Sequence, residues 1–347
     1  MPRDGDAHVD PYPMASPLSN VLGQPHAVST LRRGLASGRL HHALLFFGPA
    51  GVGKELAAFG LACAIACTRA PNEGCGECDA CRKVLKRSEL GTPMHPDIVV
   101  VEKGLYPREV LGRSTEEKTD ISVDQIRRVV LERIFTPPNE APQRLVIIRR
   151  AEEMSPGAAN ALLKTLEEPP LHTRFVLMTA HPGELLPTIR SRTLPLRFAP
   201  LPDDLVERIL REHDIDAARA AEVAPLAGGS VETALELADP DASDARSLAV
   251  DRLRSASMAP LATLLEATSS YGNTAEDRGR LRRTLEALSA VEAMELRRLV
   301  REGGSSRAIE AALQRFATAA SVTEMLDKNA NVPLALEGAW LQLSRRI

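Results

Sequence analysis

Short runs of apolar residues alternate with segments of helical periodicity through the first 200 residues of the chain. The apolar runs have the length of strands and stand at residues 40–47, 98–101, 145–148 and 175–178. Apolar residues recur at helical spacing in the segments before and between them, at 19–37, 55–67, 123–135 and 156–166. Strands that are apolar throughout and alternate with helices are typical of a parallel sheet with helices on both faces. The pattern therefore predicts an α/β domain.

The pattern changes at Leu201. Beyond this residue the strand-like runs disappear, and Ala, Leu, Glu and Arg dominate to the end of the chain. Two or three short helices are expected first, interrupted at Gly228 and Gly229, before a stretch of linker composition at 239–243. We therefore predict four segments: a disordered leader at 1–16, an α/β nucleotide-binding-like domain at 17–200, a small helical lid domain at 201–243 and an all-α collar domain at 244–347.

A glycine-rich sequence follows the first apolar run. Gly48, Gly53 and Lys54 match the phosphate-binding loop G-x4-G-K, with a predicted strand before it and a predicted helix after it. In such loops the backbone N–H groups point at phosphate oxygens, and the lysine reaches the outer phosphates. This order of elements favours common ancestry with a nucleotide-binding loop over a chance glycine-rich turn.

The elements that handle Mg²⁺ in such a site are altered. Glu55 stands where Ser or Thr would ligate the metal. The apolar run 145–148 continues into Arg149 and Arg150, where acidic residues would hold the metal and polarise the attacking water. Guanidinium groups cannot coordinate a cation, and they do not act as bases near neutral pH. We therefore predict that this site does not hydrolyse ATP, while binding of a nucleotide without turnover stays open.

A cysteine-rich module follows the second predicted helix. Four thiols fall within fifteen residues, at Cys67, Cys75, Cys78 and Cys81. Four close thiols fit a tetrahedral Zn²⁺ site, which leaves the metal no open position and is therefore structural. An iron–sulfur cluster and unliganded thiols are the alternatives, although Leu85 stands where ferredoxin spacing would need a further cysteine. We expect a zinc module at about 67–87.

Composition limits the classes of partner. A net charge of −3 and an aromatic content of 3% leave no overall basicity and few stacking platforms for nucleic acid. The basic run at 82–87 is most often a solvated helix face. No apolar run approaches the length of a membrane span, and the first residues do not form a secretory signal. Five cysteines without an export signal indicate a reducing, cytoplasmic location.

The segment ANALLKTLEEPP at 159–170 is highly distinctive. It resembles the helix that follows the second nucleotide motif in bacterial clamp-loader ATPases of the AAA+ class. VLGQ at 21–24, HHA at 41–43 and LPTIRSR at 186–192 are similar to the same family, so the resemblance runs from about Val21 to Phe198. It implies an AAA+ domain and a place in the clamp loader of DNA polymerase III.

Within that family an intact glycine loop and an acidic pair belong to the motor subunit, called tau or gamma. The resemblance implies that this chain is a non-hydrolysing neighbour of the motor. Arg192, supported by Ser191, is then an arginine finger that enters the motor's ATP site, although Thr193 departs from the family's Ser-Arg-Cys element. Glu232 fits this assignment, because motor subunits carry a phosphate-sensing Arg at that place. The sequence at 329–337 is similar to the closing helix of such neighbours.

The partners that the resemblance implies are the tau/gamma motor subunits, the delta subunit, and the sliding clamp and primed DNA through the complex. Two other functions are alternatives. An active motor of the tau/gamma type conflicts with Glu55, Arg149, Arg150 and Glu232. A zinc-dependent nucleic-acid-binding module with a vestigial loop lacks a basic stripe. From the residues alone, the alternative for Arg192 is a surface arginine or one that is paired to an Asp in its own domain.

Overall fold

The computed structural model describes residues 17–112, 120–239 and 302–327, together with single positions between 285 and 300 and between 331 and 338. The predicted leader and most of the predicted collar domain lie outside these residues. The chain divides into two compact units, Met1–Leu205 and Val206–Ile347. The lid and collar boundaries given above stay predictions.

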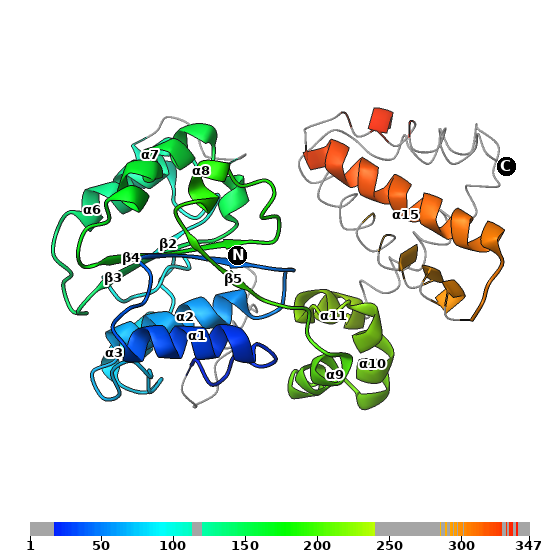
Figure 1. Ribbon diagram of the computed structural model, residues 1–347, viewed down its shortest axis with the longest axis horizontal. Helices are drawn as coiled ribbons and strands as arrows, with labels where there is room; N and C mark the ends of the chain where they lie inside the picture. Colours follow the sequence, from blue (N-terminus) through cyan, green and yellow to red (C-terminus); the bar gives the residue numbers. More distant parts are fainter. Residues whose placement is uncertain are drawn as a thin grey trace, which may run out of the picture. The chain divides into compact units, whose positions relative to one another are not determined.

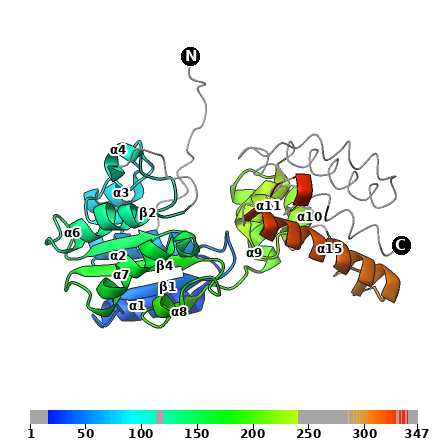
Figure 2. The same cartoon turned by 90° about the horizontal axis from the view of Figure 1, so that it is seen from above.

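The first unit is built on a parallel five-stranded sheet (Figures 1 and 2). The strand order is β2-β3-β4-β1-β5. The strands are β1 (Ala43–Phe47), β2 (Ile98–Val101), β3 (Arg144–Ile148), β4 (Thr173–Thr179) and β5 (Leu194–Arg197). The α/β domain with a parallel sheet is therefore confirmed, and β1 to β4 are the four predicted strands. Because all strands run parallel, the loops that leave β1, β3 and β4 emerge at one edge of the sheet.

Strand β5 was not predicted from the sequence. It reads LPLR, and only Leu196 among its residues is buried. The strand pairs with β1 alone, where Pro195 stands opposite Leu45. A proline without an N–H group is tolerated in such an edge position. An exposed, proline-containing edge strand carries no apolar run, so pattern reading misses it.

Alternate strand residues supply two cores, one on each face of the sheet. Leu44 and Phe46 of β1 point into the core under α1 (Pro25–Ala36) and α2 (Lys54–Ala66), whereas Leu45 points into the opposite core. The opposite core is covered by α7 (Pro156–Glu167) and by the segment that begins with α5 (Val123–Gln125). Figure 1 shows these two helical layers with the sheet between them. Since both faces are covered, the central residues of the inner strands are apolar, as at 98–101, 145–148 and 175–178.

The remaining helices of the first unit are short. The predicted helix at 123–135 consists of α5, a π-helical segment Ile126–Leu131 and α6 (Glu132–Ile134). The cysteine module contains α3 (Asp79–Leu85), and α8 (Pro187–Arg190) precedes β5. The segment between β2 and residue 120, for which the apolar pattern gives no helix or strand, contains the helical turn α4 (Arg108–Leu111) in its described part. The helix expected from residue 19 begins only at Pro25, whose fixed φ suits the first turn.

The second unit is helical in its described part. The helices are α9 (Asp203–Glu212), α10 (Ala217–Val223), α11 (Val231–Ala238) and α15 (Ser306–Asp327), and a 3₁₀ turn joins α10 towards α11 at Ala224–Leu226. The Arg219 guanidinium on α10 donates to the Leu237 carbonyl at the end of α11, at 2.7 Å. None of the described helices is long and apolar enough to cross a membrane.

A buried carboxylate anchors the edge of the sheet that lies away from the glycine loop. Asp97, which is fully buried before β2, accepts hydrogen bonds from the backbone N–H groups of residues 139, 140 and 141 at 2.7, 2.7 and 2.9 Å. It also pairs with the buried Arg144 at 3.5 Å. Burial alone would raise the pKa of Asp97, but these N–H donors lower it below the ordinary 3.8. The ionised carboxylate therefore stabilises the fold.

We expect Asp97→Asn to lower the free energy of unfolding at pH 7 by about 3–5 kcal/mol, because Arg144 would be left as a buried charge without its anion. A depressed pKa gives stability above the ordinary value that is lost as the pH falls through the folded-state pKa. The difference between wild type and variant should thus be constant above about pH 5 and shrink below pH 3.8. Urea titrations measure it, with the exposed Glu89→Gln as control. A difference that does not change with pH would contradict the argument.

Candidate functional site

The glycine loop lies at the carboxyl end of β1 and holds a conformation that glycine permits. Gly48, Gly51 and Gly53 have φ values of 145°, 65° and 94°. A Cβ atom at Gly48 would collide with the backbone carbonyl of Phe198, just after β5. Gly53 is the N-cap of α2, so the loop delivers the chain into the amino end of that helix. The strand, loop and helix predicted from the sequence are therefore confirmed.

The side chains of Lys54 and Gln24 form hydrogen bonds with backbone carbonyls of the glycine loop. The Lys54 ammonium donates to the Gly48 carbonyl at 2.6 Å and to the Pro49 carbonyl, so it turns back onto its own loop. The buried Gln24 side chain donates to the carbonyls of Val52 and Ala199 at 3.1 and 2.7 Å, and accepts from the Ala199 N–H at 3.0 Å. These contacts tie the loop to the segment that follows β5.

Glu55 and Arg149, the two altered positions, contact each other. The Arg149 guanidinium leaves the end of β3 and pairs with the Glu55 carboxylate at the start of α2. Nη2 makes this contact, and Nη1 of the same guanidinium pairs with the carboxylate of Glu102, just after β2, at 2.8 Å. Burial alone would lower the pKa of Arg149, but the two carboxylates raise it, so the guanidinium stays charged. One cation thus bridges two carboxylates beside the glycine loop.

A second arginine joins this network from the cysteine module. Arg87 follows α3, and its guanidinium lies over the ring of Phe59 on α2, 4.0 Å from the ring centroid. The same group approaches Glu55 at 3.7 Å. The prediction of a solvated basic face holds for the exposed Arg82 and Lys86, but it is wrong for Arg87. The cation–π contact with the ring and the attraction of the carboxylate together stabilise the guanidinium of Arg87 in this partly buried position.

Arg150 takes no part in the network. Its side chain is 63% exposed and lies 3.7 Å from Glu153. The residue itself adopts a left-handed conformation with a φ of 44°, which turns the chain into the 3₁₀ segment Ala151–Glu153. Of the two arginines that follow β3, therefore, only Arg149 reaches the glycine loop.

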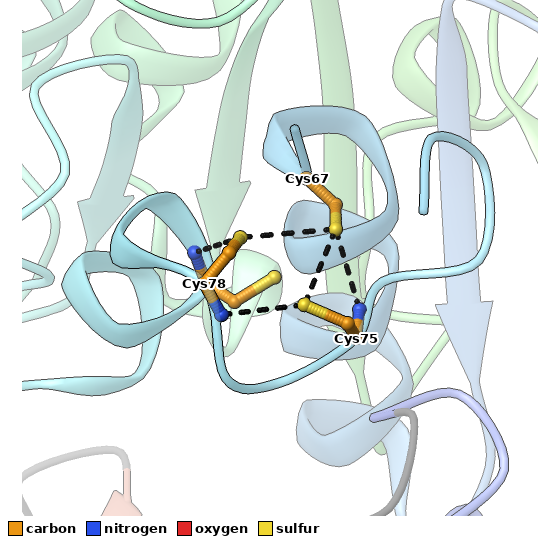
Figure 3. Close-up of side chains that lie close together, drawn as sticks. Cys67, Cys75 and Cys78 are labelled. Carbon is orange, nitrogen blue, oxygen red and sulfur yellow. Dashed lines mark hydrogen bonds between the residues drawn. The ribbon is translucent and has the colours of Figure 1, made fainter. Parts of the chain in front are cut away.

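The four predicted ligand cysteines come together between α2 and α3. All four sulfur atoms lie within 4.8 Å of one another. Cys67 ends α2, Cys78 caps α3, and Cys81 lies inside α3. Figure 3 shows the side chains of Cys67, Cys75 and Cys78 pointing towards one another. Cys67 Sγ is 3.5 Å from Cys75 Sγ and 3.8 Å from Cys78 Sγ.

The chemistry of this cluster suits a metal ion. Backbone N–H groups at Ala70 and Cys75 donate to Cys67 Sγ at 3.2 and 3.4 Å. Burial would raise the pKa of Cys78, yet the N–H groups of Cys81 and Thr68 lower it to about 6. A hydrogen bond with Cys63 and burial raise the pKa of Cys81. Tetrahedral zinc with bonds of about 2.3 Å places its sulfurs about 3.8 Å apart, close to the separations given above.

Arg192 lies between α8 and β5 and is paired inside its own unit. Its Nε donates to Glu167 Oε1 at 2.7 Å, and its Nη2 contacts the same oxygen. Nη1 donates to the Thr188 carbonyl at 3.1 Å and to Ser191 Oγ at 3.2 Å. Ser191 in turn donates to the Thr188 carbonyl at 3.1 Å, so it stabilises the turn. The side chains of Arg192 and Glu167 are 33% and 48% exposed.

Several residues of these sites were missed in the sequence. Spacing gives no sign that Arg87 and Glu102 reach Glu55 or Arg149, because they come from distant parts of the chain. Glu167 was named only within the family segment, with no role of its own. The sequence gives a partial signal for Glu102: like Arg149 it is the first residue after an apolar run, but the sequence does not show that β2 and β3 are neighbours in the sheet.

Comparison with known proteins supplies relatives for this chain. A family model described as DNA polymerase III, delta subunit, matches residues 23–202, a little over half of the chain. "DNA polymerase III subunit tau" of Escherichia coli is 35% identical over 232 residues, which cover 64% of this chain and 32% of the relative. "DNA polymerase III subunit delta'" of Pseudomonas aeruginosa is 36% identical over 201 residues, or 56% of this chain and 55% of the relative.

The chain thus spans about a third of the tau relative and about half of the delta' relative. Among solved structures, a gamma subunit-related protein of DNA polymerase III from Thermotoga maritima is 21% identical. The match covers 92% of this chain and 98% of that chain, with a TM-score of 0.41.

The network beside the loop predicts an energetic coupling between Glu55 and Arg149. Arg149→Met should destabilise the first unit, because Glu102 would lose its cation and Glu55 would keep, among the described residues, only the more distant Arg87. Glu55→Gln should cost less, since Glu55 is 47% exposed and Arg149 keeps Glu102. In a double-mutant cycle followed by urea unfolding, we expect a coupling of about 0.5–2 kcal/mol that decreases in high salt. Additive effects would show that the two residues do not interact in solution.

Proposed function

The chain belongs to the family described as DNA polymerase III, delta subunit, and on that premise we propose that it is the delta-prime subunit of the bacterial clamp loader. In this role it does not hydrolyse ATP. It stands beside a tau/gamma motor subunit, supplies Arg192 to the motor's ATP site, and with the delta subunit helps to load the sliding clamp onto primed DNA. Sequence identity does not separate delta-prime from the motor, since relatives of both types are matched at 35–36%.

One observation carries the choice: the ion pair between Arg149 and Glu55. Hydrolysis needs Mg²⁺ held beside the phosphates by a hydroxyl and a carboxylate. Here a glutamate and an arginine stand at those two positions and neutralise each other. The carboxylate beside the loop is thus already paired with a protein cation, which supports a site that does not hold Mg²⁺. An active motor of the tau/gamma type is therefore the weaker candidate.

The location and charge of Arg192 support its proposed role as a donated arginine. It follows a short helix at the border of β5, the strand at the open edge of the sheet. Its pair with Glu167 is partly exposed, and exposed ion pairs contribute only about 0–1 kcal/mol, so a phosphate can compete for the guanidinium. Positive charge aimed at the γ-phosphate stabilises the transition state of phosphoryl transfer. Ser191 supports the arginine through Nη1.

The cysteine cluster is proposed to hold one structural Zn²⁺. Cys67, Cys75, Cys78 and Cys81 supply four sulfurs at suitable separations, with no position left for a substrate. The metal would fix α3 against the end of α2. A zinc-dependent nucleic-acid-binding module remains the weaker alternative. Arg87, in the segment that follows α3, points at Phe59 and Glu55 of its own unit and therefore adds no charge to a basic surface.

The zinc assignment predicts the metal content of the protein. Protein purified without added chelator should contain about one zinc per chain, and Cys78→Ser should lose it. The variant should show faster hydrogen exchange at residues 67–87, whereas α15 should keep its protection. Elemental analysis measures the metal, and Cys63→Ala is the control: it removes the buried thiol beside Cys81 that is not one of the four proposed ligands, so the metal should be kept. Iron in place of zinc, or metal retained by Cys78→Ser, would refute the assignment.

The Arg192 assignment predicts the behaviour of the assembled complex. Arg192→Ala should join the motor and delta subunits normally but lower the clamp- and DNA-stimulated ATPase rate. An arginine finger raises kcat by a factor of about 10³–10⁵ at the site it serves. The loss measured for the whole complex should be smaller, because motor sites that receive an arginine from other subunits stay active. Arg192→Lys should rescue poorly, because an ammonium lacks the planar fork. A full ATPase rate of the Arg192→Ala complex, at matched incorporation of this chain, would show that Arg192 is structural.

The isolated chain should not hydrolyse ATP. Hydrolysis by the isolated chain that is abolished by Lys54→Ala would instead indicate a motor subunit.

A further inference from the structure

A carboxylate at the end of α7 fixes the direction of the Arg192 guanidinium. Glu167 is the last residue of α7, and its Oε1 accepts from both Nε and Nη2 of Arg192. The remaining contacts come from the turn that contains Thr188 and Ser191, through Nη1. A guanidinium has five N–H donors in a rigid plane. Four of these donors are used by the partners named above, and no further hydrogen bond of the guanidinium to a described residue is seen.

The end of α7 is itself held firmly. The His42 ring, just before β1, donates through Nε2 to the Leu166 carbonyl at 2.9 Å. The Glu168 N–H donates to the Lys164 carbonyl at 3.0 Å, and prolines at 169 and 170 prevent the helix from continuing. Glu167 therefore projects from a helix end that is anchored to the sheet. A side chain on such an element can hold a second residue in a fixed orientation.

Electrostatics favours the pair at this place. A carboxylate in the last turn of a helix lies near the partial negative charge of the helix end. A cation is therefore attracted both by Glu167 and by the carbonyls around it. The pair is nevertheless partly exposed, so the guanidinium is not buried in its own unit and remains accessible to a neighbouring molecule.

We propose that Glu167 is a positioning residue that orients Arg192 towards the phosphate of the nucleotide bound by the neighbouring subunit. This inference rests on the proposed function, in which Arg192 acts in trans. Glu167 does not touch the nucleotide. It removes the rotational freedom of the arginine, which would otherwise be lost when the transition state forms. Orientation of reacting groups accounts for large rate factors, and small misplacements cost about 10²-fold.

The experiment uses the complete clamp-loader complex with matched amounts of this chain. In the Glu167→Ala complex, the part of the ATPase rate that depends on Arg192 should fall on the order of tenfold. The kcat of the complex should fall towards that of Arg192→Ala, while the KM for ATP should stay unchanged. Glu167→Gln should retain most of the rate, because its amide oxygen can still accept from Nε and Nη2. Glu168→Ala, which removes the neighbouring exposed carboxylate, is the matched control.

A double variant separates this inference from the proposed function. Glu167→Ala should have no further effect in the Arg192→Ala background, since its role passes through the arginine. If Arg192→Ala alone leaves the rate unchanged, the finger itself is refuted. If Arg192→Ala lowers the rate but Glu167→Ala matches or exceeds wild type, only the positioning role is refuted. An equal loss with Glu167→Gln and Glu168→Ala would also overturn it, because it would indicate a general charge effect.

Discussion

The ion pair of Glu55 and Arg149 is the constraint on which the rest of the candidate site depends. Each residue alone would be less well placed: an unpaired carboxylate would repel phosphate, and the largely buried guanidinium at the end of β3 would have Glu102 as its one remaining anion among the described residues. Together with Glu102 they form a closed group of charges. The glycine loop keeps its shape beside this group. The strand, the glycine loop and the helix are thus retained, with the paired charges of Glu55 and Arg149 beside them in place of a hydroxyl and a carboxylate.

The same pair connects the cysteine module to the loop. The module begins where α2 ends. The chain after α3 lies beside α2, so that Arg87 reaches Phe59 and Glu55. A metal ion at one end of α2 and an ion pair at its other end would both fix the position of that helix. The module is therefore part of the support of the loop, in addition to any contact that it makes with other molecules.

Much of the first unit could be predicted from the sequence because its inner strands are apolar on both faces. The loop and the four cysteines were predictable because their spacing is local. Strand β5 was missed because three of its four residues are exposed. The partners of Arg149 and Arg192 were also missed, since Glu102 and Glu167 lie 47 and 25 residues away along the chain. Pairing across a fold depends on strand order, and local patterns do not contain strand order.

The close approach of Gly48 to the Phe198 carbonyl has an evolutionary consequence. Any larger residue at this position would disturb the junction of β1 with the chain after β5, whether or not a nucleotide is bound. Selection for folding alone would therefore maintain this glycine in a chain that does not hydrolyse ATP. A phosphate-loop signature can outlast its chemistry in this way. Genome surveys that count ATPases by the glycine pattern will include chains of this kind, and only the residues next to the pattern distinguish them.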